Sequence, residues 1–430
     1  MSRGGKEQPR GMSRRELLRA VGAAGAGFAL GAGGTALSTG TLAARPRREI
    51  RDGARDQRVP FYGVHQAGIA TPQQEHLHFA AFDLTTKSLE DVRELMRAWT
   101  EAGARMCAGE PAGEENTSPF MPPEDTGEAL GLRPARLTLT FGFGPTLFEK
   151  AGEDRFGIKD SRPEALVEIP PMPGDALEED SCGGDLGVQA CADDPQVAFH
   201  AVRNLARIAR GTAVMRWSQL GFGRTASTSR EQSTPRNLMG FKDGTANIKA
   251  EDEELMRRYV WVARGDGPAW MENGTYLVAR RIRMFIEVWD RVPLTEQERS
   301  IGRHKYSGAP IGAEHEFDPV DLEARDENGD PLIPENSHVR LARENEEQRI
   351  LRRGYSFTDG MDRERGQLDA GLFFICFQRD PRRQFIPLQR RLARNDLLNE
   401  YIRHTGSAIF ACPPGAHRGG YVGQILLEGA

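Results

Sequence analysis

The amino-acid sequence predicts an α+β protein with two similar modules, each running strand–helix–strand–strand–helix–strand. Three observations support this prediction: an internal repeat, a strand-like segment after each copy of it, and a strand–helix pair before each copy. The repeat aligns DLGVQACADDPQVAFHAVRNLAR (185–207) with DAGLFFICFQRDPRRQFIPLQRRLAR (369–394). In each copy an apolar run with one cysteine leads to Asp-Pro, and the copy ends on Leu-Ala-Arg. Because Asp favours the N-cap of a helix and Pro its first turn, each copy predicts a strand followed by a helix.

The elements of the first module begin with HLHFAAFDL (76–84), whose residues alternate as in a half-buried strand. SLEDVRELMRAWTEAG follows, with apolar side chains on one helical face and Ser88 as the expected N-cap. RLTLTFGFG (136–144) supplies another strand before the repeat, and GTAVMRWSQLGF (211–222) supplies a last strand after it.

The elements of the second module follow a similar order. TYLVARRIRMFIEVWDR (275–291) predicts a strand that runs into a turn. TEQERSIG then starts a helix, with Thr295 and Glu298 as an expected capping box. The second copy of the repeat adds a strand and a helix with Asp380 as the expected N-cap, and GSAIFACPP (406–414) adds a final strand.

Together these elements predict two ferredoxin-like (βαββαβ) modules with four-stranded antiparallel sheets, of the dimeric α+β barrel type. We place the N-terminal module at residues 45–225 and the C-terminal module at residues 275–430. Residues 226–274 connect the two modules. Because loops between scaffolded elements commonly carry function, we expect functional residues in this connector.

The first 44 residues are typical of an export signal. Arg14 and Arg15 precede a Gly/Ala-rich apolar stretch, and small residues follow at TLAA. This order is that of a secretory signal, and the arginine pair indicates the twin-arginine type. The rival interpretation is a membrane anchor, but the apolar run is short and weakly hydrophobic, since a span needs about 20 strongly apolar residues. We therefore expect a periplasmic or extracellular protein with no membrane span in its mature form.

Charge and cysteine content narrow the classes of partner. Residues 1–44 hold six basic and two acidic residues, so the mature chain carries 51 basic and 60 acidic residues and a formal charge of −9. Nucleic-acid binding, which needs a concentrated basic face, is therefore not expected. The five cysteines form no CxxC pair; Cys182 and Cys191 could form a disulfide, although buried free thiols are the better-supported interpretation.

Three short segments carry the candidate chemistry. In GFKDGTAN (240–247), Gly240 and Gly244 flank Asp243, which suits a tight turn or a site for proton transfer. His338, in ENSHVRLA, is either a structural histidine or an axial ligand, since neutral imidazole binds iron well. Arg352, in ILRRGYSF, is either a surface charge or a guanidinium that stabilises an anion in a pocket.

These segments resemble those of dye-decolourising-type haem peroxidases, in the order found in that family. GFKDGTAN matches the GxxDG motif, HVRLA is similar to the proximal-histidine segment, and LRRGYSF is similar to the distal-arginine segment. HQAGIATPQQEHLHFAAFDLTT (65–86) and DAGLFFICFQRD also resemble the family, so the resemblance covers most of the mature chain. With the export signal, it points to the exported deferrochelatase/peroxidase subgroup.

The resemblance implies one haem b per chain and a role for each matching residue. It makes His338 the axial ligand of the haem iron and assigns Asp243 and Arg352 to the distal side, where Arg352 also contacts the cofactor. Gly244, Thr245 and Ala246 are then expected along the haem edge. We expect Asp369 to accept a hydrogen bond from the other ring N–H of His338, which would increase electron donation by the imidazole.

The activity implied is oxidation of dyes, phenolics or similar one-electron donors by hydrogen peroxide. Asp243 would move the proton and Arg352 would stabilise the developing charge. Because a carboxylate has a reference pKa near 4, this role predicts an acidic activity optimum. The alternative is a deferrochelatase that releases iron from haem. The expected partners then include proteins of iron uptake, and a second copy of the chain in a homo-oligomer. A third interpretation is an α+β binding protein without metal.

Overall fold

The computed structural model describes residues 58–429, so the predictions for residues 1–44 lie outside the described residues. The first module contains, in chain order, β1 (His76–Leu84), α2 (Leu89–Cys107), β2 (Thr138–Phe143), α3 (Pro145–Phe148), η1 (Lys159–Ser161), η2 (Glu179–Ser181), β3 (Leu186–Ala192), α4 (Pro195–Ile208) and β4 (Ala213–Arg224). The strands are antiparallel neighbours in the order β2-β3-β1-β4. Two helix starts are confirmed: Ser88 accepts a hydrogen bond from the Asp91 amide before α2, and Asp194 accepts one from the Gln196 amide before α4.

The remaining chain forms the connector and the second module. Their elements are α5 (Glu253–Tyr259), η3 (Ala269–Met271), β5 (Thr275–Met284), α6 (Ile286–Trp289), α7 (Leu294–Ile301), α8 (His338–Arg343), η4 (Glu346–Gln348), β6 (Leu351–Arg352), β7 (Tyr355–Asp362), β8 (Gln367–Gln378), α9 (Phe385–Asn395), η5 (Leu397–Glu400), β9 (Ile402–Cys412) and α10 (Gln424–Glu428). The long strands are antiparallel neighbours in the order β9-β5-β8-β7. No pattern in the sequence predicts β7.

The two groups of strands do not form separate four-stranded sheets, and that part of the predicted fold is wrong. β4 pairs with β7 through Phe222 and Ser356, and β2 pairs with β9 through Phe143 and Ala411. Eight strands therefore close into one antiparallel ring, with the short β6 added beside β8. Closure occurs because each module leaves edge strands whose backbone groups need partners. The α+β class is confirmed.

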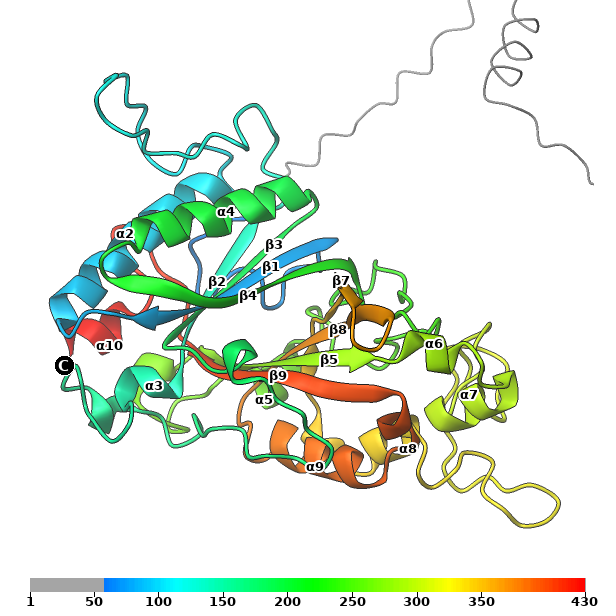
Figure 1. The fold of residues 1–430 in the computed structure, drawn as a ribbon. Helices are drawn as coiled ribbons and strands as arrows, with labels where there is room; N and C mark the ends of the chain where they lie inside the picture. The colour runs from blue at the N-terminus through cyan, green and yellow to red at the C-terminus, as the bar shows by residue number, and fades with distance from the viewer. Residues whose placement is uncertain (1–57, 430) are drawn as a thin grey trace, which may run out of the picture. The chain divides into compact units, whose positions relative to one another are not determined.

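Helices cover the outer faces of this ring, and apolar side chains fill its inside. Figure 1 shows α2 and α4 over the strands of the first module, and α8 and α9 on the opposite side, beside β5 and β9. One core cluster lies inside the ring, with Phe79, Tyr355 and Phe373 among its buried members. A smaller cluster around Trp289 packs Phe241 of the connector against the second module. Within residues 58–429, no helix has the length and apolar character to cross a membrane.

Two predicted helix caps are wrong. α9 begins at Phe385 rather than directly behind Asp380, and the Asp380 carboxylate caps the turn before the helix by accepting from the Arg382 amide at 2.9 Å. α7 begins at Leu294 behind Pro293, so Thr295 lies inside the helix, and the Glu298 carboxylate binds the amide of Lys305. All five cysteines are free thiols, including Cys182 and Cys191.

A buried histidine in β1 predicts a pH dependence of stability. Burial lowers the pKa of His78 to about 4, and its Nδ1 atom has no hydrogen-bond partner. As pH falls below about 6.5, the unfolded chain takes up a proton that the folded chain refuses. Folding stability is therefore lost between about pH 6.5 and pH 4, and a change from pH 7 to pH 5 should cost about 2 kcal/mol through this residue.

Urea unfolding of the purified protein at pH 7 and pH 5 measures this loss. His78→Leu should remove about 2 kcal/mol of the pH dependence, because leucine does not titrate. An identical pH dependence in the two proteins would show that His78 is not held neutral by burial.

Candidate active site

The GFKDGTAN segment forms a tight turn, as predicted. Gly240 and Gly244 have φ values of 83° and 92°, which only glycine adopts without strain. A Cβ atom at Gly244 would lie 2.8 Å from the Cα atom of Ala226, so this glycine also permits close backbone packing. The Asp243 amide donates to the Pro235 carbonyl at 2.9 Å, which fixes the backbone of the acid.

Asp243 and Arg352, which are 109 residues apart in the sequence, form an ion pair. The Arg352 Nη1 atom donates to Asp243 Oδ1 at 2.7 Å, and Asn237 Nδ2 donates to Asp243 Oδ2 at 3.2 Å. The side chains of Asp243 and Arg352 remain 15% and 29% exposed. The pair therefore offers an acid and a cation side by side at one accessible place.

The neighbouring arginine points the other way. Arg352 belongs to β6, and Arg353 directly after it is fully buried, where its guanidinium donates to the Thr71 carbonyl and the Gln74 side chain. Side chains alternate between the two faces of a strand, so only one residue of an Arg-Arg pair can face the site. Arg352 is that residue.

His338 is the first residue of α8, and its ring is held by a carboxylate. The partner is Asp396, whose Oδ2 atom lies 2.6 Å from His338 Nδ1. The predicted partner, Asp369, is wrong: it accepts from Arg281 Nη2 at 2.9 Å. Asp396 is 3% exposed and its other oxygen caps η5 by accepting from the Leu398 amide, so its orientation is fixed from both sides.

The electrostatics of His338 connect it to the ion pair. Burial lowers the pKa of His338, but the Asp396 carboxylate raises it, and the net direction is upward. Asp243 raises the pKa of His338 further and Arg352 opposes it, which shows that both charges lie within electrostatic reach of the ring. The three residues, predicted from three separate segments, therefore converge on one site.

The residues at this site fit a haem. His338 Nε2 makes no hydrogen bond to any of residues 58–429, and the side chain is 36% exposed. A histidine that donates one ring N–H to a carboxylate and leaves the other nitrogen free is typical of a metal ligand. Among the same residues no cluster of three His, Cys, Asp or Glu could hold a bare metal ion.

Two further arginines, Arg303 and Arg343, lie near Arg352. Burial lowers the pKa of Arg303 to about 10, and the like charges of Arg343 and Arg352 lower it too. Three guanidinium groups close enough to interact suit a cofactor that carries carboxylates. No feature of the sequence singled out Arg303 or Arg343, because each lies in a charged stretch that resembles ordinary protein surface.

The predicted haem-edge residues lie together on the GFKDGTAN turn, with one difference in environment. The Thr245 hydroxyl donates to Glu316 Oε1 at 3.1 Å, and Glu316 also pairs with Lys242 at 2.8 Å. The Thr245 side chain is therefore used to anchor the turn. Gly244 is buried and Ala246 is exposed, so these two present backbone and a methyl group.

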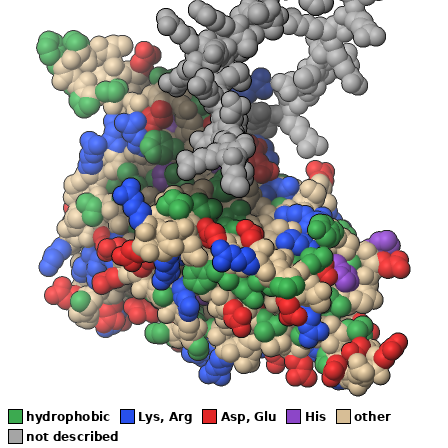
Figure 2. Space-filling view, turned by 45° about the vertical axis from the view of Figure 1, so that its right-hand side comes forward, with side chains coloured by type: hydrophobic (Ala, Val, Ile, Leu, Met, Phe, Trp, Pro, Cys, Tyr) green, Lys and Arg blue, Asp and Glu red, His purple; other side chains and the backbone are tan. Residues whose placement is uncertain are grey.

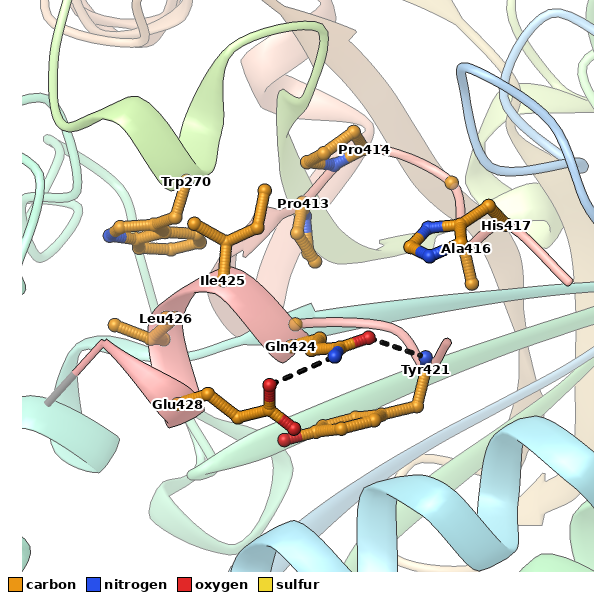
Figure 3. Close-up of a pocket in the computed structure, with 12 residues that line it drawn as sticks. Trp270, Pro413, Pro414, Ala416, His417, Tyr421, Gln424, Ile425, Leu426 and Glu428 are labelled. Atoms are coloured by element: carbon orange, nitrogen blue, oxygen red, sulfur yellow. Dashed lines mark hydrogen bonds between the residues drawn. The ribbon is translucent and has the colours of Figure 1, made fainter. Parts of the chain in front are cut away.

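A cavity of about 250 Å³ lies elsewhere in the fold and contains none of these residues. Figure 3 shows that it is formed by Trp270, the segment of Pro413 and Pro414, and side chains in and before α10 such as Tyr421. On the face of the molecule in Figure 2, acidic and basic side chains are interspersed.

Comparison with known proteins gives one consistent family. The N-terminal model of Dyp-type peroxidase matches residues 66–223, and the C-terminal model matches residues 234–417. The chain is 43% identical to the dye-decolorizing peroxidase of Thermobifida fusca, with 98% of each chain covered, and 38% identical to the deferrochelatase of Escherichia coli K12, with 97% of each covered.

Solved structures agree with this result. A DyP-type peroxidase from Streptomyces coelicolor has a TM-score of 0.79 at 42% identity, and ferric DtpA from Streptomyces lividans has a TM-score of 0.78 at 41% identity. Each comparison covers 86% of this chain and 97% of the other. The chain therefore belongs to the Dyp-type peroxidase family and is a haem peroxidase.

Proposed function

We propose that the peroxidase reaction takes place at the Asp243–Arg352 pair, near His338, and that its donors are dyes, phenolics or similar one-electron reductants. The observation that carries this proposal is the 2.7 Å contact between Asp243 Oδ1 and Arg352 Nη1, within electrostatic reach of the His338 ring. An acid–base group and a fixed positive charge are the two groups that cleavage of a peroxide O–O bond requires.

Asp243 moves the proton in this proposal. Its carboxylate takes the proton from one oxygen of hydrogen peroxide and delivers it to the other oxygen, which departs as water. Asn237 and Arg352 each bind one carboxylate oxygen, so the group is oriented before peroxide arrives. A preoriented base avoids the reorganisation that a mobile side chain would need.

Arg352 stabilises negative charge on the departing oxygen. Its Nη1 atom is used by Asp243, and the other guanidinium N–H groups remain available to the peroxide. His338, Arg303 and Arg343 would hold the haem, which supplies reversible two-electron redox chemistry when bound. In the whole reaction, hydrogen peroxide takes two electrons, one from each of two donor molecules, and two protons, and gives two molecules of water.

A second candidate function is the release of iron from haem. It is supported by the 38% identity to proteins named deferrochelatase. This function needs His338 and the surrounding arginines, but it does not need a proton transfer by Asp243. The two functions therefore differ in their dependence on this one carboxylate.

We also propose export by the twin-arginine pathway to the periplasm or beyond. The Arg14–Arg15 pair and the apolar stretch behind it support this proposal. From the resemblance to the exported subgroup we also propose that the protein forms a homo-oligomer and that it has partners among the proteins of iron uptake.

Replacing the proposed acid–base group separates the two candidate functions. Asp243→Asn should lower the rate of reaction with hydrogen peroxide by about 100-fold or more, because asparagine cannot carry the proton. The haem Soret band should be retained, and so should any release of iron from haem. Stopped-flow absorbance with excess peroxide measures the rate.

Asp369→Asn is the matched control, since Asp369 is also paired with an arginine but lies away from the site. It should leave the peroxide rate unchanged. A wild-type peroxide rate in Asp243→Asn would rule out the proposed role of Asp243.

The contact between His338 and Asp396 predicts a redox effect. Asp396→Asn should raise the midpoint potential of the bound iron and weaken haem binding by about 10- to 100-fold, because the imidazole donates less electron density without a carboxylate partner. Spectroelectrochemical titration measures the potential. A larger shift in Asp369→Asn than in Asp396→Asn would contradict the assignment of Asp396 as the partner.

A further inference from the structure

We propose that Asn247 is a positioning residue that sets the place of the Arg352 guanidinium by holding the backbone of Arg352. Its side-chain Oδ1 atom accepts from the Arg352 amide at 2.8 Å, and its Nδ2 atom donates to the Arg352 carbonyl at 2.9 Å. One side-chain amide thus binds both polar backbone groups of the same residue. The inference rests on the role proposed above for Arg352.

Arg352 needs such a partner because of the strand to which it belongs. β6 has two residues and pairs with β8 on one side only, where Arg352 lies opposite Cys376. The next amide, that of Arg353, donates to the Ile375 carbonyl at 2.8 Å. In an antiparallel pair, residues alternate between those bonded to the neighbour and those whose N–H and C=O point away. The backbone groups of Arg352 therefore point away from β8.

Asn247 supplies what a neighbouring strand would supply at this place, namely one acceptor and one donor. Asparagine is suited to this because its side chain carries both groups at a short distance from the backbone. Aspartate has no donor for the Arg352 carbonyl, and alanine has neither group. Without this contact, the backbone of Arg352 would depend on a two-residue strand that is bonded along one edge.

Asn247 is itself fixed. It is 6% exposed, its backbone amide donates to the Gly244 carbonyl at 3.0 Å, and Nδ2 also donates to the Ser227 carbonyl at 3.1 Å. The Lys249 ammonium donates to the same carbonyl at 2.8 Å, which holds Ser227 in place. All hydrogen-bonding groups of the Asn247 side chain are therefore used in one arrangement.

This arrangement links the two reacting side chains through a short path. Asp243 and Asn247 belong to the same tight turn, and the Asn247 side chain is hydrogen-bonded to the backbone of Arg352. The position of the guanidinium relative to the carboxylate is then determined by the turn rather than by the ion pair alone. A misplacement of about 1 Å at a reacting group can cost about 100-fold in rate. Loss of the hydrogen bonds from Asn247 to Arg352 should therefore lower the rate of the peroxide reaction.

The test is a double-mutant cycle on the haem-loaded protein with Asn247→Ala, Arg352→Leu and the double variant. Two quantities are measured: the rate of reaction with hydrogen peroxide, and the dissociation constant of fluoride for the ferric protein, which reports a hydrogen-bond donor beside the bound anion without turnover. Asn247→Ala should slow the peroxide reaction by roughly 10- to 100-fold and weaken fluoride binding, and it should have no further effect on either quantity in the Arg352→Leu background.

Asn204→Ala is the matched control. Asn204 is fully buried and also binds one residue, Thr126, through both ends of its amide: Oδ1 accepts from the Thr126 amide and Nδ2 donates to the Thr126 hydroxyl. It lies in α4 of the first module. A comparable loss of thermal stability with a wild-type peroxide rate is expected for this variant. If Asn247→Ala fails to hold haem, Asn247→Asp replaces it, since the carboxylate keeps the acceptor for the Arg352 amide.

The outcomes separate the inference from the proposal on which it rests. Equal losses from Asn247→Ala in both backgrounds would mean that Asn247 acts independently of Arg352, and the inference would be overturned. A slow Arg352→Leu with an unaffected Asn247→Ala would also overturn it while leaving the role of Arg352 intact. A wild-type peroxide rate in Arg352→Leu would overturn both, because there would be no catalytic arginine to position.

Discussion

The ion pair between Asp243 and Arg352 is the interaction on which the account of the site depends. Its members come from the connector and from β6, and no local rule of structure brings these segments together. Either residue alone has an ordinary explanation, as a turn aspartate or as a surface arginine. At 2.7 Å and in reach of His338, they place a carboxylate beside a fixed positive charge, which is the combination that we propose for peroxide cleavage.

The closed sheet explains how such distant residues meet. Because β4 pairs with β7, the end of the first module is joined to the strand that follows Arg352. The connector runs from β4 to β5 and passes near β6. Its tight turn packs on Ala226. The part of the site around His338 is built separately, since His338 begins α8 and Asp396 caps η5. A rigid ring therefore carries two independently anchored halves of one site.

The sequence predicted the elements better than their assembly. The strand at 76–84 and the helices behind Ser88 and Asp194 follow from local alternation and capping, which need no distant partner. Closure of the ring depends on pairing between β2 and β9 and between β4 and β7, and a repeat says nothing about how its two copies join. The same limit explains β7, whose residues Thr358–Met361 are exposed and lack the apolar alternation of a strand.

The site residues also fall into a group that the sequence predicted and a group that it did not. His338, Asp243 and Arg352 were predicted because each stands in a segment that resembles a known motif, whereas the groups that hold them were not. Asp396 lies 58 residues from His338, and in the sequence it is marked only as an aspartate before an apolar pair.

The most direct test of the account is the visible spectrum of the haem-loaded protein before and after one equivalent of hydrogen peroxide. The account predicts complete conversion to an oxidised spectrum, and two equivalents of a one-electron donor should restore the original. A spectrum unchanged by peroxide would contradict it.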